Sequence, residues 1–368
     1  GPGQRHSNPV FGRLDAVIDF ASPCWKDTLL FLEPNLSCMG GLHLVPMAER
    51  IVAEVVLPAL QSEDAALALE RGTDVRELLA QEMLDHWDHL GRPDGDFCLI
   101  EPKYADSGPD EQRALAHFFQ ERFDLKVWHA DPTELRLRDE EVYYGDRRVS
   151  VAYRDYPIAD LIALEAQGAD VGPMRTLFRQ NRVLSSISAL FDHKSCWEVL
   201  TDPLLAGKYF TPEEQEVFHR HVPWTRSCTA RLATLPHGQE GPLLAYVCQD
   251  QEFLVLKPDR AFGGEGVILG KSVTRAEWQA ALHRALADVE PWVVQELATI
   301  PVHDFPVAEA EGKVHLRPFY TVMGFSATRY GLAVLGRASP SPVVNVAQGG
   351  GMFAVLVGHR HQDDKVTR

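Results

Sequence analysis

The residues most suited to chemistry in this sequence are a lysine and the glycine cluster that follows it. Lys257 ends the apolar stretch 253–257, which has the composition of a β-strand, and Gly263, Gly264 and Gly266 precede a second apolar stretch. Because glycine has no Cβ, the backbone N–H groups of such a turn can surround an anion. The pattern predicts a β-hairpin that covers a phosphate group, with a plain glycine hairpin and a surface lysine as the alternative. The spacing matches neither the Walker pattern nor the Rossmann fingerprint.

Two pairs of polar residues near the start of the chain could bind a cation. Arg13 and Asp15 are two positions apart on one expected strand, and Glu33 and Asn35 are two apart at the end of the next. Residues two apart on a strand share a face, so Asp15, Glu33 and Asn35 could form an all-oxygen cluster suited to Mg²⁺. Arg13 could hold a negative substrate group beside them. The alternative for each pair is a solvated strand face, and Asp19 is a reserve ligand if the strand register differs.

Five more residues are candidates for ligand contacts. Lys194 lies near the start of an expected helix and could face a phosphate, although a solvated helix position is the simpler interpretation. Gln295 and Glu296 end an apolar strand bounded by prolines, where a strand-to-loop exit could meet a flat base. Arg317 and Arg337 lie on two later expected strands, and each could clamp a phosphate or carboxylate with two hydrogen bonds.

Composition limits the class of protein. The chain has 368 residues, 45% hydrophobic content and a net charge of −16 without a run of Lys or Arg, so nucleic acid is not expected as the partner. Six scattered cysteines without a CxxC pair favour reduced thiols in a cytoplasmic protein over a disulfide framework or a zinc site. Neither a signal peptide nor an apolar run of about 18 residues is found, so we expect no export and no membrane partner.

The chain divides into three parts by pattern. Residues 11–58 hold the polar strands described above, and residues 181–368 hold both lysines, the glycine hairpin and the Gln-Glu strand end. Between them, residues 59–180 alternate helices and strands at a spacing that predicts βαβ units over a parallel sheet. The middle part offers no recognisable specificity code, and we expect it to lie on the substrate side.

Taken in order, these motifs resemble the ATP-grasp superfamily. The resemblance covers about residues 11–48 and 181–355, and it includes the R-x-D and E-x-N pairs, two lysines, the FGGEG turn and the VVQE strand end. The E-x-N pair stands at the start of the chain, where the usual order puts it last. This order is similar to circularly permuted ATP-grasp proteins, including the synthetase domain of glutathionylspermidine synthase. We expect no amidase domain within these 368 residues.

The resemblance implies an α/β (α+β) protein with a circularly permuted ATP-grasp fold and an inserted substrate domain. It further implies a carboxylate–amine ligase that uses ATP and Mg²⁺ and passes through an acyl phosphate. By implied role, the residues are Lys194, Lys257, Gly263, Gly264 and Gly266 for the ATP phosphates, Asp15, Glu33 and Asn35 for Mg²⁺, Gln295 and Glu296 for the adenine or ribose, and Arg13, Arg337 and Lys257 for catalysis.

Other functions stay open at this point. A small-molecule kinase would use the same nucleotide site but would release a phosphorylated product without needing an amine. A non-catalytic ATP-binding protein would lack a complete set of metal ligands, and the presence of Asp15, Glu33 and Asn35 argues against it. The expected substrates are a small carboxylate and an amine, such as an amino acid, a peptide or a polyamine, and a homodimer is left open.

Overall fold

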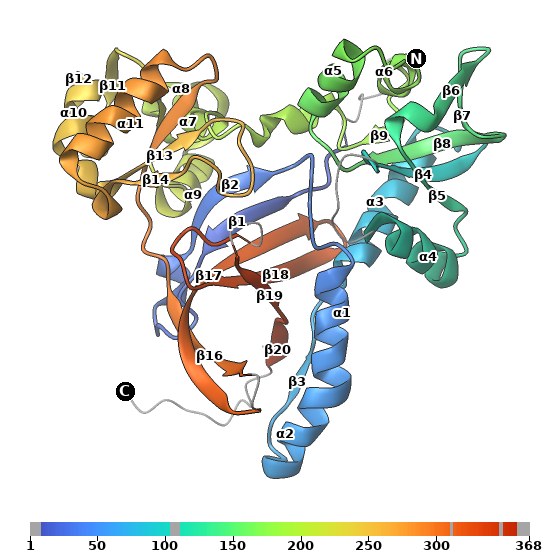
Figure 1. The fold of residues 1–368 in the computed structure, drawn as a ribbon, viewed down its shortest axis with the longest axis horizontal. Coiled ribbons are helices and arrows are strands. Elements are labelled where there is room, and N and C mark those ends of the chain that lie inside the picture. The colour runs from blue at the N-terminus through green and yellow to red at the C-terminus, as the bar shows by residue number, and fades with distance from the viewer. Residues whose placement is uncertain (1–8, 104–110, 310–311, 346–348, 359–368) are drawn as a thin grey trace.

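The computed structural model describes residues 9–103, 111–309, 312–345 and 349–358. Figure 1 shows a central antiparallel sheet with one lobe on each side of its upper edge. One lobe is built from residues near the middle of the chain, and the other carries both lysines and the glycine hairpin. A mixed α/β fold is therefore confirmed.

The central sheet joins the two ends of the chain. Its strands run in the order β19–β18–β17–β1–β2, with β16 on the far part of β17, and all pairs are antiparallel. The six strands are β1 (Arg13–Val17), β2 (Leu30–Asn35), β16 (Val302–Ala308), β17 (Val314–Thr328), β18 (Gly331–Ser339) and β19 (Gly351–Phe353). The N-terminal pair thus lies beside strands that come some 300 residues later, which brings their side chains onto one surface.

The lobe from the middle of the chain contains the expected parallel strands. Strands β5, β4, β8 and β9 are parallel neighbours, and β6 and β7 extend the sheet as an antiparallel hairpin. The apolar run of β4 is buried on both faces, as is usual when helices cover a parallel sheet. Its elements are β4 (Asp96–Ile100), β5 (Val127–Ala130), β6 (Leu135–Arg138), β7 (Glu141–Tyr144), β8 (Arg147–Arg154), β9 (Val183–Leu184), α3 (Val75–His89), α4 (Glu111–Phe123), α5 (Ile158–Ala166) and α6 (Gly172–Arg179).

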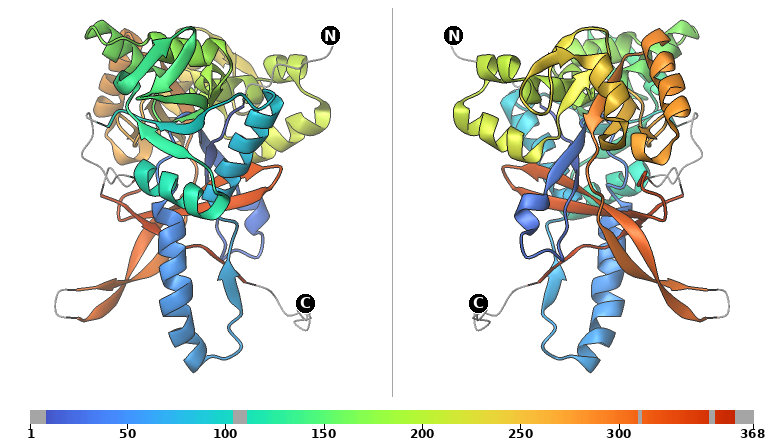
Figure 2. Two further views of the ribbon diagram at one scale, coloured as in Figure 1. Left: turned by 90° about the vertical axis from the view of Figure 1, so that its right-hand side faces the viewer. Right: turned by 90° about the vertical axis from the view of Figure 1, so that its left-hand side faces the viewer.

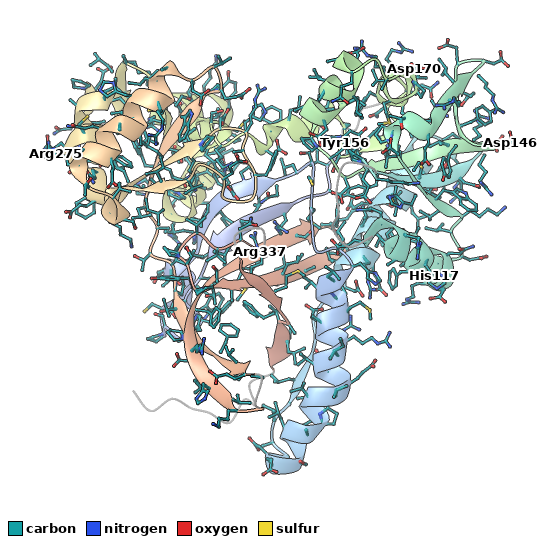
Figure 3. The ribbon with its side chains drawn as sticks, viewed as in Figure 1. His117, Asp146, Tyr156, Asp170, Arg275 and Arg337 are labelled. Carbon is teal, nitrogen blue, oxygen red and sulfur yellow. The ribbon has the colours of Figure 1, made fainter. Side chains whose placement is uncertain are left out.

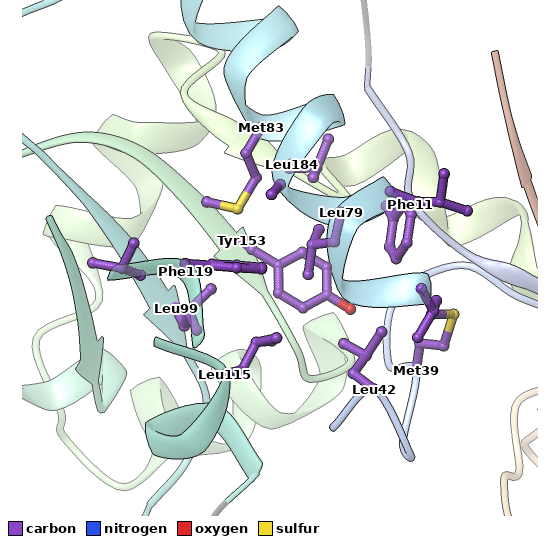
Figure 4. Close-up of a cluster of buried hydrophobic side chains, with 14 of the residues drawn as sticks. Phe11, Met39, Leu42, Leu79, Met83, Leu99, Leu115, Phe119, Tyr153 and Leu184 are labelled. Atoms are coloured by element: carbon purple, nitrogen blue, oxygen red, sulfur yellow. The ribbon is translucent and has the colours of Figure 1, made fainter. Parts of the chain in front are cut away.

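One hydrophobic cluster ties this lobe to the central sheet. Tyr153 of β8 lies at its centre, fully buried, with its ring edge-on to Phe11 at 6.4 Å between centroids (Figure 4). The cluster also includes Leu79 of α3 and Leu335 of β18, so helix α3 packs between the two sheets. Burial of side chains of this size stabilises by roughly 1.5–3 kcal/mol each, which holds the lobe against the sheet.

The second lobe is a four-stranded antiparallel sheet covered by helices. Its strands run in the order β10–β15–β13–β14, and the expected hairpin is confirmed as β13 paired with β14. Helices α9 and α11 begin at Thr211 and Thr274, each with a reciprocal capping box that satisfies two backbone donors. Its elements are α7 (Cys196–Thr201), α8 (Pro203–Tyr209), α9 (Pro212–His221), β10 (Thr225–Ser227), β11 (Leu232–Thr234), β12 (Glu240–Pro242), α10 (Leu243–Gln249), β13 (Leu254–Pro258), β14 (Ile268–Leu269), α11 (Arg275–Ala287) and β15 (Trp292–Glu296).

Two projections extend from the central sheet on the side away from the lobes (Figures 1 and 2). One is the β16–β17 ribbon. The other is a continuous helix of α1 (Leu44–Ile51), a π-helical segment (Val52–Val56) and α2 (Leu57–Glu63), accompanied by the pair β3 (Leu69–Arg71) and β20 (Leu356–Gly358). No helix within the described ranges is long and apolar enough to cross a bilayer.

Candidate functional site

The R-x-D and E-x-N pairs share one face of the central sheet. In the register of β1 and β2, Arg13 lies opposite Asn35, and Asp15 lies opposite Glu33. The alternation of side chains along a strand places all four on the same side. Arg337, on β18, reaches the same spot from the other side of β17 (Figure 3).

Asp15 is the centre of a buried ionic cluster. Its Oδ1 accepts a hydrogen bond from Arg13 Nε at 2.7 Å, while its Oδ2 accepts from Asn35 Nδ2 at 2.8 Å and lies 2.6 Å from Arg337 Nη2. Burial alone would raise the pKa of Asp15, but the charges and hydrogen bonds of Arg13 and Arg337 outweigh it and hold the pKa below its ordinary value of 3.8. Asp15 is therefore ionised at neutral pH, and the two guanidinium groups are fixed beside it.

A glycine of the neighbouring strand makes room for this cluster. Gly324 of β17 is the register partner of Asp15. A Cβ at Gly324 would lie 2.1 Å from Arg13 Cδ, so any other residue would displace the arginine. Gly324 was not among the predicted site residues, although an isolated glycine within a strand pattern is a known signal of close approach.

Glu33 connects the sheet to the glycine hairpin through Lys194. Lys194 Nζ lies 3.5 Å from Glu33 Oε2 and donates a hydrogen bond to the carbonyl of Ala261 at 2.7 Å. Lys194 sits in a turn just before α7, and its side chain is 7% exposed. The solvated helix position considered from the sequence is therefore wrong, because the backbone of Lys194 is bound to Asp259 and its side chain turns inward.

Lys257 lies deep in the second lobe. Its Nζ donates to Gln295 Oε1 at 2.7 Å, and the residue is 8% exposed. Burial lowers the pKa of Lys257 from 10.5 to about 8; the nearby charges of Glu33 and Asp15 oppose this effect, and that of Lys194 adds to it. The surface lysine considered as an alternative from the sequence is excluded by this burial.

Three glycines of the hairpin have backbone conformations that favour glycine. Gly263, Gly264 and Gly266 have φ angles of 69°, 75° and 70°, in the left-handed region that other residues rarely adopt. A Cβ at Gly266 would also lie 2.7 Å from the Pro258 ring. The turn thus follows from sequence, and it closes over the end of β13 that carries Lys257.

These elements line one pocket that opens to solvent. Its polar lining residues are Asp15, Glu33, Lys257, Gln295, Glu296, Arg337 and Asn345, and Gly264 of the hairpin also lines it. Arg13, Asn35, Lys194, Gly263 and Gly266 do not line it, but the first three are bonded to Asp15 or Glu33 and the last two belong to the hairpin. The structure therefore gathers the sequence-predicted site residues around a single cavity.

The pocket also has walls that sequence reasoning missed. Its apolar lining includes Leu32 of β2, Val255 of β13 and Ile300 beyond β15. The segment from Pro342 to Asn345 lines it as well, and the three residues that follow, 346–348, lie outside the described ranges. An apolar cavity with a few convergent charged groups is the usual form of a small-molecule site.

Arg317 is placed elsewhere. It lies on the β16–β17 ribbon, where Nη2 bonds Glu309 Oε1 at 2.9 Å and the side chain is 57% exposed. Arg317 does not line the pocket, so of the two arginines proposed as clamps only Arg337 is at the site.

The predicted metal ligands fit a divalent cation by donor type. Asp15 Oδ1 accepts one strong hydrogen bond, from Arg13, which leaves it a lone pair, and Glu33 lines the pocket with its side chain 28% exposed. Asn35 donates a hydrogen bond from Nδ2 to Asp15, and its side-chain oxygen Oδ1 can serve as a metal ligand. Two carboxylates and an amide oxygen are hard ligands of the kind Mg²⁺ takes. Within the described ranges, no group of three or more His, Cys, Asp or Glu side chains is arranged to hold a metal ion.

Two proteins whose names describe a ligase are similar to this chain. No protein-family model matches the chain. It is 28% identical over 348 residues to "Putative glutamate--cysteine ligase 2-2" of Frankia casuarinae, covering 88% of this chain and 36% of that protein. It is 29% identical over 379 residues to "Putative glutamate--cysteine ligase 2-3" of Frankia alni, covering 95% and 40%. The chain thus spans less than half the length of these two relatives.

A solved structure shares the fold. The glutathione synthetase-like effector GSS30 of Globodera pallida, in its apo form, superposes with a TM-score of 0.59 over 95% of this chain and 78% of that one. The two are 10% identical in sequence, so the likeness concerns the fold alone.

Proposed function

We propose that this chain is an ATP-dependent ligase with a circularly permuted ATP-grasp arrangement, which joins a carboxylate to an amine through an acyl phosphate. The observation that carries the proposal is the convergence of Lys257, Glu33, Asp15 and Arg337 on one pocket beneath the glycine hairpin. The names of the Frankia relatives support a ligase, and the fold of the glutathione synthetase-like effector supports the same class.

In this proposal the second lobe holds ATP. Lys194 and Lys257 contact the phosphates, and Gly263, Gly264 and Gly266 close over them, which suits a phosphoryl transfer that depends on positioning and charge neutralisation. The apolar wall of the pocket receives the base. Glu296 lies near the ribose, and its carboxylate is held by a hydrogen bond from the backbone N–H of Trp224 at 3.1 Å.

The central sheet holds the reacting groups. Mg²⁺ held by Asp15, Glu33 and Asn35 would supply charge neutralisation at the phosphates. Arg13 and Arg337 are kept in place by Asp15, so they can stabilise the negative charge of the acyl phosphate without reorganising. The carboxylate oxygen attacks the γ-phosphorus and ADP leaves. The amine nitrogen then attacks the acyl carbon, the carbon–oxygen bond to phosphate breaks, and one proton is released.

The three parts of the chain have different roles in this proposal. Residues 11–58 and 181–368 together form the nucleotide and metal site, and residues 59–180 form the substrate-side domain. The names of the relatives suggest amino acid substrates, and a homodimer is compatible with the proposal.

Product analysis tests the proposal directly. The purified protein is incubated with Mg-ATP, pooled amino acids and polyamines, and the mixture is analysed by mass spectrometry. We expect ADP, phosphate and a new mass equal to two components minus water. ADP with a phosphorylated acid or alcohol as the final product would indicate a kinase, and AMP with pyrophosphate would refute the acyl phosphate.

Two alanine variants test the site. We expect Lys257→Ala and Glu33→Ala each to lower turnover by about 10²–10³-fold or more while the circular dichroism spectrum stays unchanged, because the first removes a cation at the phosphates and the second removes a proposed metal ligand. Two exposed residues of the same lobe serve as controls: Glu265→Ala in the hairpin, which we expect to be a solvated loop residue, and Lys271→Ala beyond it. Normal ADP formation by both site variants would overturn the assignment.

A further inference from the structure

Gln295 is more deeply buried than a residue that reads a base needs to be. It is 1% exposed, and its side-chain amide is engaged at both ends. The Oε1 atom accepts a hydrogen bond from Lys257 Nζ at 2.7 Å, and Nε2 donates to Thr225 Oγ1 at 2.9 Å and to the carbonyl of Leu32 at 3.4 Å. Both N–H donors of the amide are therefore used within the protein, and its oxygen already accepts from Lys257, so the amide cannot offer a donor–acceptor pair to a purine.

The orientation of this amide is determined by its neighbours. Gln295 lies on β15 between β10 and β13, where its register partners are Thr225 and Val255. The Thr225 hydroxyl is fully buried and donates to the carbonyl of Pro223 at 2.9 Å, so its oxygen can only accept from Gln295. Nε2 must then face Thr225, and Oε1 must face Lys257.

The same amide connects the two sheets of the site. Leu32 is the residue before Glu33 on β2 of the central sheet, whereas Thr225 and Lys257 belong to the second lobe. One side chain thus joins the strand that carries a predicted metal ligand to the strand that carries a predicted phosphate ligand. A displacement of about 1 Å in either strand would misplace groups that act together on a phosphoryl group.

Lys257 needs such support because it is buried. Burial disfavours its charged form, and a carbonyl oxygen at 2.7 Å stabilises the ammonium and directs its remaining protons. The other charged groups near it are Glu33 from β2, Asp15 from β1 and Lys194 from the turn before α7. None of these three makes a direct hydrogen bond to Lys257 within the described part of the chain.

We infer that Gln295 is a positioning residue, which orients Lys257 toward the nucleotide phosphates and ties β15 to β2, and that it does not recognise the base. This inference rests on the proposed ATP site and replaces the earlier expectation that Gln295 lies near adenine or ribose. It assigns base recognition to the remaining walls of the pocket.

Nucleotides that differ in phosphate number or in base distinguish a role in positioning Lys257 from a role in base recognition. Binding of ATP, ADP, AMP and GTP is measured by calorimetry for the wild type and for Gln295→Leu. If Gln295 acts through Lys257, we expect ATP and ADP to bind about tenfold more weakly to the variant, because a hydrogen bond to a charged group is lost. AMP should bind within about twofold of the wild type, and the preference for ATP over GTP should not change.

The pH dependence provides a readout that loss of structure would not imitate. Phosphate binds the ammonium form, so wild-type affinity for ATP should fall above pH 8, by up to about tenfold per pH unit, as Lys257 loses its proton. Gln295→Glu places a carboxylate beside Lys257 and should move this decline to higher pH. Gln295→Leu should move it to lower pH.

Each outcome decides the inference. If AMP binding falls as much as ATP binding, or if the ATP preference changes while the pH profile stays the same, then Gln295 reads the base and the inference is wrong. If Gln295→Leu does not fold, Thr225→Val carries the test, because Thr225 is linked to Lys257 through the Gln295 amide. A wild type that binds no ATP would overturn the proposed function and the inference together, which distinguishes that failure from the loss of the inference alone.

Discussion

Two aspartates at the centre of the molecule differ in what surrounds them. Asp15 lies on β1 of the central sheet, between the guanidinium groups of Arg13 and Arg337. Asp155 follows β8 of the middle lobe, where its Oδ1 accepts from the Met39 N–H at 3.0 Å and its Oδ2 accepts from the Gln112 side chain. One carboxylate has two cationic partners, and the other has neutral ones.

Their pKa values move in opposite directions as a result. Burial raises the pKa of Asp155 from 3.8 to about 7, and the nearby carboxylates Glu101 and Glu111 add to the rise against the Met39 hydrogen bond. At Asp15 the arginines outweigh burial and lower the pKa. Asp15 is the more deeply buried of the two and yet has the lowered pKa, so the charge of the neighbours decides whether a carboxylate is a permanent anion or titrates near neutral pH.

The two sites are joined by a short loop. Met39, which contacts Asp155, is followed by Gly40, whose carbonyl accepts a hydrogen bond from Arg13 Nη1 at 3.1 Å. The ionic cluster of the central sheet and the titrating carboxylate of the middle lobe thus hold adjacent residues of one segment. Asp15 and Asp155 can each be substituted separately, so the effect of their different neighbours can be measured.

The largest expected difference concerns stability at pH 8. Asp15→Asn leaves two buried guanidinium groups without their shared anion, and breaking a buried ion pair in this way costs about 3–5 kcal/mol. Asp155→Asn removes a carboxylate whose burial is unfavourable but also replaces one acceptor oxygen by an N–H donor, so it should cost at most about 1–2 kcal/mol, less than Asp15→Asn. Urea denaturation of both variants measures the free energies of unfolding. Equal losses would mean that the arginines do not determine the difference.

The next effect is a dependence of stability on pH. The folded protein binds a proton at Asp155 up to about pH 7, whereas the unfolded chain releases it near pH 3.8. The free energy of unfolding should therefore decrease as pH rises from about 4 to 7, by on the order of 2 kcal/mol after allowance for partial exposure. Asp15 acts in the opposite sense: its contribution is present above pH 3.8 and is lost as pH falls through its lowered pKa.

Comparison of the wild type with Asp155→Asn isolates the first contribution. The difference between their free energies of unfolding, measured in urea at pH 4.5, 6 and 8, should grow in favour of the variant as pH rises. A difference that stays constant over this range would show that Asp155 is ionised throughout, as Asp15 is.

Much of the central site follows from local rules that a sequence displays. The two-residue spacing of Arg13 and Asp15, and of Glu33 and Asn35, predicts a shared face, and the structure places them on one. The apolar stretches around the glycine cluster predict the β13–β14 hairpin, which is confirmed. Patterns with period two and glycine turns depend only on neighbours along the chain, so they can be read without the fold.

The partners of these residues could not be read in the same way. The sequence marks Arg337 as a clamp but does not connect it to Asp15, because that contact depends on β17 lying between β1 and β18. Gln295 was expected beside the base, and its burial follows from the central position of β15, which no local pattern shows. Asp155 was not singled out at all, since it lies in a Tyr-Arg-Asp-Tyr-Pro stretch that ends a strand and is buried by the distant segment around Met39.

The smallest effect that sharpens the comparison comes from Glu111. Its carboxylate accepts hydrogen bonds from the N–H groups of Gly41, His43 and Leu44 at 2.9–3.0 Å, where α1 begins, and its charge raises the pKa of Asp155. Glu111→Gln keeps the shape but removes the charge, so it should cost about 1 kcal/mol at the helix N-terminus. It should also move the pH-dependent loss of stability to lower pH.

A matched variant and a double variant separate these two consequences. Glu121→Gln, on the exposed side of the same helix α4, removes an equal charge without touching either site and should leave the pH profile unchanged. Adding Asp155→Asn to Glu111→Gln should abolish the shift but keep the cost at the helix end. If the profile of Glu111→Gln matches that of the wild type, the charge of Glu111 does not contribute to the raised pKa of Asp155, which then depends on burial and on Glu101.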